Sequence, residues 1–324
     1  MKQQEFSFSQ SMLTMISNST PSTISRLAAK LNLKGTDKSG SRKKYSFEDS
    51  RNILYEMVAK NHVVEKTVQV FFNFKGGTGK TSLCHQMSVH MAILGFKVLA
   101  IDCDPQAHLT FALGINHEED NMTLYDVIVN KIPVKEVVKK IYPGVDLIPS
   151  DLSLTRIELP LSQITNREKI LNKIIQPLKD EYDFIFIDTN PTISILNQNT
   201  TYCADVVNIV CETQPFSLKG LDMLVNELKE FSVEMEQEIP YRIIPNKYES
   251  KTATSQEVLG SLIHDYKDAV METIVRKCED INISAKKQMP VCGFCKKRSI
   301  AFEDMCDLSL AILAESTYKR IENE

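Results

Sequence analysis

The sequence predicts an α/β fold, in which a doubly wound, mostly parallel sheet follows a small N-terminal helical domain. Three observations lead to this expectation. After residue 65, short apolar runs alternate with helical segments, a pattern typical of parallel strands covered by helices on both faces. A glycine-rich turn joins the first apolar run to a helix. Before residue 65, the pattern is helical and rich in polar residues.

The composition agrees with a globular protein and excludes several other classes. Hydrophobic residues make up 43% of the 324-residue chain and charged residues 25%, which excludes disordered and collagen-like chains. The longest apolar stretches, such as residues 91–94, are far shorter than the roughly 18 residues of a membrane-spanning helix. No secretory signal is evident, and the eight cysteines suggest reduced thiols, so we expect a cytoplasmic protein.

Residues 1–65 are expected to form the helical domain. Four apolar residues in it share one helical stripe, namely Ile24, Leu27, Ala28 and Leu31. Residues 34–44 are rich in glycine, serine and positive charge, which predicts a loop or wing. Ser46 and Asp49 have the spacing of a capping box and predict a helix over about residues 47–60.

Residues 66–324 are expected to form the α/β domain. Its predicted strands are residues 68–72, 97–101, 145–149, 184–187, 206–210 and 241–244. The spacing predicts a helix over about residues 81–94 and a long polar helix over about residues 167–180.

The strongest functional signal is the segment of residues 75–82, which follows a predicted strand and opens a helix, as a phosphate-binding loop does. Its glycines allow backbone N–H groups to point at phosphate oxygens beside the helix N-terminus. The expected nucleotide ligands are Lys75, Gly76, Gly77, Thr78, Gly79, Lys80, Thr81 and Ser82. We expect Lys80 to hold the β- and γ-phosphates of ATP and Thr81 to bind Mg²⁺.

Two of the predicted strands end in carboxylates. Asp102 and Asp104 end the second strand, at the edge where α/β sheets bind ligands. Asp188 directly follows four apolar residues, the form of a Walker B motif, and is expected to bind Mg²⁺ through water.

Together these motifs resemble the ParA/MinD family of deviant Walker A P-loop ATPases over about residues 68–313. Lysine at position 75 is the mark of that class, and the resemblance implies that Lys75 reaches the nucleotide of the other subunit in a dimer. The residues around Asp104 are similar to those of ParA partition ATPases. This implies that Asp104 orients the attacking water and that Asp102 helps to hold the Mg²⁺ shell. Residues 245–248 are similar to the family's stretch that contacts the base, which implies that Asn246 recognises adenine.

The resemblance implies a DNA partition ATPase that acts as a dimerising switch and hydrolyses ATP to ADP and phosphate with Mg²⁺. Its catalytic residues are then Lys75, Lys80 and Asp104. In that interpretation the ATP-bound homodimer binds DNA of any sequence on the nucleoid, and a ParB-like centromere-binding protein stimulates hydrolysis. A membrane partner is not expected.

The N-terminal segment is also similar to a known module. Residues 42–49 resemble the wing and following helix of winged helix-turn-helix modules attached to longer plasmid ParA proteins. That resemblance implies binding to an operator and repression of the protein's own operon. A small helical accessory or dimerisation segment is the alternative.

Three rival functions stay open from the sequence. A MinD-like positioning ATPase would bind a membrane through a C-terminal amphipathic anchor, whereas residues 318–324 are polar. An iron–sulfur cluster carrier ATPase would use Cys292 and Cys295, which form a Cys-x-x-Cys pair. A regulatory DNA-binding repressor would retain the nucleotide pocket without using it for partition.

Overall fold

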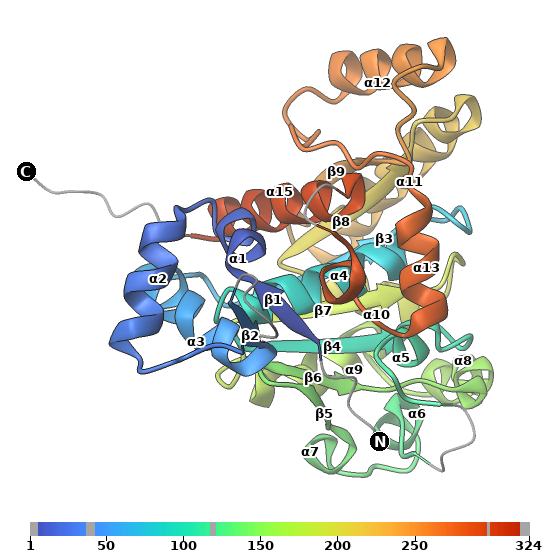
Figure 1. Ribbon diagram of the computed structural model, residues 1–324. Helices are drawn as coiled ribbons and strands as arrows, with labels where there is room; N and C mark the ends of the chain where they lie inside the picture. Colours follow the sequence, from blue (N-terminus) through green and yellow to red (C-terminus); the bar gives the residue numbers. More distant parts are fainter. Residues whose placement is uncertain (1–5, 37–42, 117–120, 297–298, 318–324) are drawn as a thin grey trace, which may run out of the picture.

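The computed structural model of the protein describes residues 6–36, 43–116, 121–296 and 299–317 and is centred on a seven-stranded sheet (Figure 1). Its strands are β3 (Thr67–Phe72), β4 (Val98–Cys103), β5 (Lys139–Tyr142), β6 (Val145–Ile148), β7 (Phe184–Thr189), β8 (Val206–Glu212) and β9 (Tyr241–Asn246). They lie in the order β5-β6-β4-β7-β3-β8-β9. Every neighbouring pair is parallel except β5 and β6, so the mostly parallel sheet predicted from the sequence is confirmed.

Helices cover both faces of this sheet. They are α4 (Lys80–Ile93), α5 (His108–Ala112), α6 (Leu124–Ile128), α7 (Val134–Val137), α8 (Glu158–Ser162), α9 (Ile170–Ile175), α10 (Ile195–Cys203), α11 (Pro215–Met235), α12 (Ala253–Asp265), α13 (Glu279–Lys287), α14 (Val291–Phe294) and α15 (Ile300–Glu315). Short 3₁₀ turns are η2 (Leu152–Arg156), η3 (Arg167–Lys169) and η4 (Gln176–Leu178).

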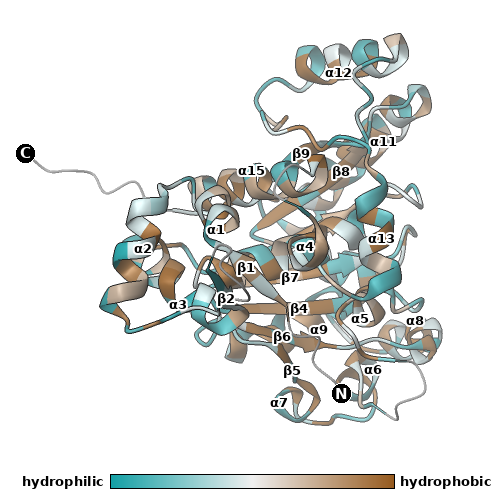
Figure 2. Cartoon of the chain, in the orientation of Figure 1, coloured by the Kyte–Doolittle hydropathy of each residue, from teal (hydrophilic) through white to brown (hydrophobic). Residues whose placement is uncertain are grey.

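Alternate residues of the central strands enter two separate cores, because successive side chains of a strand point to opposite faces. Phe71 of β3 packs on the face covered by α4 and α15, whereas Val70 packs on the face covered by α9, α10 and α11. Every residue of β3, β4 and β7 is buried, as expected for parallel strands between two helical layers. Figure 2 shows the hydrophobic residues gathered in strands such as β4 and β6, with hydrophilic residues on outer helices such as α13.

The single helix expected over about residues 167–180 is wrong. The structure has η3, α9 and η4 in its place. Pro177 lies in η4, where it lacks the N–H that a continuous α-helix would need.

The elements before the sheet, here called the N-terminal unit, place their apolar residues in the same core as α4 and α15. These elements are β1 (Ser7–Ser9), α1 (Gln10–Ile16), α2 (Pro21–Lys30), β2 (Lys44–Ser46), α3 (Phe47–Met57) and the 3₁₀ turn η1 (Ala59–Asn61). β1 and β2 pair antiparallel, and the side chains of Ser9, Thr20 and Ser46 cap the three helices. Most of the predicted wing, residues 37–42, lies outside the described residues.

This unit packs against the α/β domain near the amino ends of the strands. Arg51 of α3 donates hydrogen bonds to the carbonyl oxygens of Gly95 (2.8 Å) and Phe96 (3.1 Å), just before β4. Phe6 and Phe47 pack against Tyr142 of β5. Figure 1 shows α1, α2 and α3 on the left, away from α5 and α13 at the other end of the sheet.

In the part of the chain that the structure describes, none of the helices has both the length and the apolar character needed to cross a bilayer. The polar tail of residues 318–324, on which the expected absence of a membrane anchor rests, lies outside that part.

Candidate functional site

The glycine-rich loop between β3 and α4 lies at the carboxyl edge of the sheet. Gly77 (φ 77°) and Gly79 (φ 100°) have left-handed backbone conformations, which glycine adopts without a steric penalty. A Cβ atom at Gly79 would also lie 2.4 Å from Nδ2 of Asn246. The loop therefore requires glycine at this position, and it leads directly into α4, whose first turn has free N–H groups for an anion.

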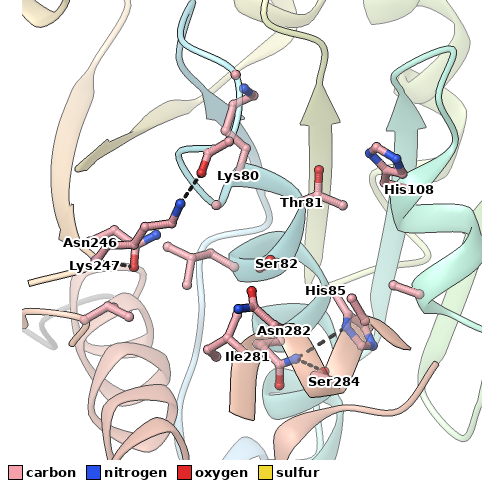
Figure 3. Close-up of a pocket in the computed structure, with 18 of the residues that line it drawn as sticks. Lys80, Thr81, Ser82, His85, His108, Asn246, Lys247, Ile281, Asn282 and Ser284 are labelled. Carbon is pink, nitrogen blue, oxygen red and sulfur yellow. Dashed lines mark hydrogen bonds between the residues drawn. The ribbon is translucent and has the colours of Figure 1, made fainter. Parts of the chain in front are cut away.

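Lys80 begins α4 and its side chain is buried within the loop. It is 6% exposed, and its Nζ donates to the carbonyl oxygen of Lys75 at 3.3 Å. Burial lowers the pKa of Lys80, while the charges of Asp188 and Asp104 raise it again. Figure 3 shows Lys80, Thr81 and Ser82 at the start of the helix, with Asn246 and Lys247 on one side and His108 on the other.

Asp188, near the end of β7, is a buried carboxylate with unused acceptors. It is 0% exposed, and neither of its oxygens has a hydrogen-bond partner of normal geometry among the described residues. Burial raises the pKa of Asp188 well above its usual value and the charge of Asp102 raises it further, whereas Thr81 and Lys80 lower it. A buried acid without partners is costly, and a divalent cation held beside the Thr81 hydroxyl would remove that cost. The residues present therefore fit Mg²⁺.

Asp102, the register partner of Asp188, has its acceptors filled. Its Oδ2 accepts from the backbone N–H (2.8 Å) and the hydroxyl (2.7 Å) of Thr110, and its Oδ1 accepts from the N–H of Asp104 (3.0 Å). Burial raises the pKa of Asp102 to about 6. Asp104 lies at the wall of the cavity, 8% exposed, and its Oδ1 accepts from the N–H of Gln106. Asp102 thus fixes the backbone that presents Asp104.

Lys75 is held within its own subunit. Its backbone N–H donates to Oδ1 of Asn73 (2.9 Å), and its Nζ donates to Oε2 of Glu212 at 2.6 Å. The other oxygen of Glu212 accepts from Nζ of Lys247 at 2.7 Å. The sequence analysis missed Glu212 and Lys247. Glu212 carries the same signal as Asp188, because both are acids at the carboxyl end of a buried strand.

Asn246, the candidate for base recognition, lies beside the loop. Its Nδ2 donates to the carbonyl oxygen of Thr78 at 2.7 Å, and its Oδ1 accepts from the N–H of Lys247. Both polar ends of the side chain are therefore engaged, and this geometry ties β9 to the loop.

A cavity of about 770 Å³ opens beside the loop and is lined by several of these residues. Its wall includes the loop, Asp104, Asn246 and Lys247, together with residues 275–278 and residues of α13 between Ile281 and Lys286. Gln86 of α4 donates to the hydroxyl of Ser284 at 2.8 Å, which fixes α13 against α4. The cavity is large enough for a nucleotide, with the loop at one end and α13 forming another wall.

The Cys-x-x-Cys pair lies elsewhere. Cys292 is 1% exposed, and burial raises its pKa well above the usual value. Within the described ranges, no group of three or more His, Cys, Asp or Glu side chains could hold a metal ion. Cys292 is thus buried inside its own subunit, which does not favour a cluster shared between two subunits.

Comparison with known proteins places this geometry in a family. The sequence model of a family described as an AAA domain matches residues 66–241. The cell division protein PomZ of Myxococcus xanthus is 31% identical over 225 residues, which are 69% of this chain and 70% of that protein. The chromosome partitioning protein ParA of Caulobacter vibrioides is 28% identical over 207 residues, 63% of this chain and 78% of that protein.

A solved structure shares the fold. A plasmid partition protein from Borrelia burgdorferi, bound to AMPPNP, has a TM-score of 0.65 and 22% sequence identity. The match covers 78% of this chain and 100% of that chain.

Proposed function

We propose a mechanism for this chain on the basis of its family. The chain belongs to the AAA domain family and, within it, to the ParA-type partition ATPases. It is an ATPase whose cofactors are ATP and Mg²⁺, and it acts in ATP-dependent partition. The observation that carries this conclusion is the buried Asp188 carboxylate, which has no hydrogen-bond partner of normal geometry and lies beside Lys80 and Thr81 at the start of α4.

Different residues of the site bind the phosphates, the Mg²⁺ and the attacking water. Backbone N–H groups of the loop and the Lys80 ammonium bind the phosphates, while Thr81 and Asp188 hold Mg²⁺. When bound, Mg²⁺ neutralises phosphate charge that develops during the reaction. Asp104 orients the attacking water, and Asp102 keeps Asp104 in place through its backbone N–H.

The ATP state is a homodimer in which Lys75 of each subunit contacts the nucleotide of the other. Two lysines and a metal ion then stabilise the charge of the transition state. This dimer binds duplex DNA of any sequence through its phosphates, and a ParB-like centromere-binding protein stimulates hydrolysis and releases it.

The N-terminal unit adds operator binding and repression of the protein's own operon. Two consecutive helices, α1 and α2, lie in the chain between β1 and β2, which pair antiparallel, and two consecutive helices are the basis of a helix-turn-helix. Ser25 and Arg26 of α2 and Lys43 and Lys44 beside the wing are exposed, so both parts have side chains available for DNA.

DNA binding in different nucleotide states tests the switch. We expect a slowly hydrolysed ATP analogue to give binding to arbitrary duplex DNA that weakens steeply with salt, whereas ADP gives little. Equal affinity in both states would contradict the switch. Sedimentation with anionic liposomes separates the membrane-positioning alternative, because ATP-dependent pelleting would favour that function.

Hydrolysis tests the repressor alternative. We expect Asp104→Ala to lose most of its phosphate release and to keep ATP binding, since Asp104 acts on the water and not on the phosphates. A wild-type protein that binds ATP without measurable hydrolysis would favour the repressor.

A further inference from the structure

We propose that Glu212 holds Lys75 inside its own subunit and thereby sets the concentration at which the ATP-bound protein dimerises. The inference rests on the proposed function, in which Lys75 acts in the partner's site. Glu212 is then a positioning residue that acts through Lys75.

Glu212 is placed to bind two ammonium groups at once. It ends β8, is 8% exposed, and uses one carboxylate oxygen for Lys75 (2.6 Å) and the other for Lys247 (2.7 Å). Partial burial by itself would raise the pKa of Glu212, but the hydrogen bonds and charges of Lys247 and Lys75 outweigh it and lower the pKa. Glu212 is therefore ionised near neutral pH and attracts both lysines.

Lys247 remains paired with Glu212 when Lys75 leaves. It has a left-handed backbone conformation (φ 57°), and its Nζ also donates to the carbonyl oxygen of Gly77 in the loop. The neighbouring Asn246 binds the loop at Thr78. Lys247 is thus fixed to its own subunit by several contacts, whereas the Lys75 side chain is 45% exposed and contacts Glu212 through its end alone.

Releasing Lys75 from Glu212 costs a small amount of free energy. Lys75 must leave Glu212 before its Nζ can reach a phosphate in another subunit. When it leaves, Glu212 keeps Lys247 as a counter-ion, so no unpaired charge is left in the partly buried site. The lost pair is half exposed and of modest strength, worth roughly a threefold change in an equilibrium constant.

A symmetric dimer breaks two such pairs, one in each subunit, so the effect on dimerisation is squared. Glu212→Gln keeps the shape of the side chain and removes its charge. We therefore expect the dissociation constant of the dimer to fall about tenfold, from roughly threefold in each subunit.

The experiment is analytical ultracentrifugation of the full chain with a saturating, slowly hydrolysed ATP analogue, so that differences in nucleotide affinity do not enter. The matched control is Glu249→Gln. Glu249 lies just after β9 and pairs with Lys277 at 2.9 Å, so that variant removes the same charge beside the same site without touching Lys75. We expect it to dimerise as the wild-type chain does.

Salt gives a second readout that a merely structural role would not move. The advantage of Glu212→Gln should shrink as salt rises, because salt screens the half-exposed pair of the wild-type chain. Lys247→Met covers the case in which Glu212→Gln does not fold. It leaves Lys75 as the single partner of Glu212, so dimerisation should weaken.

The outcomes separate the two proposals. If the wild-type chain dimerises with the analogue but Glu212→Gln matches it, or Lys247→Met dimerises more readily, the role of Glu212 is overturned and the switch stands. If the wild-type chain forms no dimer with the analogue, the proposed function fails, and the role of Glu212 with it.

Discussion

The carboxyl ends of β4 and β7 carry two aspartates at the same depth in opposite surroundings. Asp102 and Asp188 are register partners and both are 0% exposed. Asp102 accepts three hydrogen bonds, whereas neither oxygen of Asp188 has a partner of normal geometry within the described residues, and only the Thr81 hydroxyl and the Lys80 charge favour its ionised form. An acid whose acceptors are filled by its own chain supports the local backbone, and one whose acceptors are unused can bind a cation. Burial alone does not distinguish these roles.

The largest effect should come from Asp188→Asn. We expect ATP hydrolysis to fall by about a hundredfold or more, because the variant loses a charge that holds Mg²⁺ at the reacting phosphates. Without nucleotide, its free energy of unfolding should change little, since burial already disfavours the charged form of Asp188. Phosphate release and urea unfolding measure the two quantities. Hydrolysis within threefold of the wild-type rate would contradict a role of Asp188 in binding Mg²⁺.

Asp102→Asn should lose more stability and less hydrolysis than Asp188→Asn. Its amide cannot accept from all three donors, so one buried N–H or hydroxyl loses its partner, and we expect the free energy of unfolding to fall by about 2 kcal/mol. Hydrolysis by the folded protein should fall less than in Asp188→Asn. Urea unfolding beside the Asp188 variant makes the test, and a greater loss of stability in Asp188→Asn would contradict it.

Thr110→Val tests the same contrast by removing a hydroxyl that donates to Asp102. The Thr110 hydroxyl donates to Asp102 and accepts from the N–H of Ser150 at 3.0 Å, so its removal should cost about 1 kcal/mol. Thr155→Val is the control, because the Thr155 hydroxyl donates to a backbone carbonyl at an exposed position. We expect that control to change the free energy of unfolding by less than about 0.5 kcal/mol. Equal losses in the two variants would show that Asp102 gains nothing from Thr110.

The sequence predicts most of the strands but does not predict the difference between Asp102 and Asp188. The six predicted strands are all present, because buried parallel strands are continuous apolar runs. β5 was missed, since its sequence begins with Lys139 and Lys140 and lies at the sheet edge. Asp102 and Asp188 look alike in sequence, both following apolar residues. The donor that separates them, Thr110, comes from the next helix, and only the folded chain brings it to Asp102.

Glu212 extends the comparison to a third carboxylate at this edge, one whose acceptors are filled by two lysine side chains. Its pKa is lowered in the folded protein, so the stability from its ion pairs is present above its usual pKa of 4.5 and is lost as the pH falls below that value. Because both lysines are more than a third exposed, the contribution should be at most about 1 kcal/mol. We expect wild-type and Glu212→Gln proteins to differ in free energy of unfolding at pH 7 and to converge near pH 3.5. A difference that is the same at both pH values would mean that Glu212 and Gln differ in hydrogen bonding that does not depend on the charge of Glu212. That outcome would contradict the proposal, in which the charge of Glu212 holds Lys75.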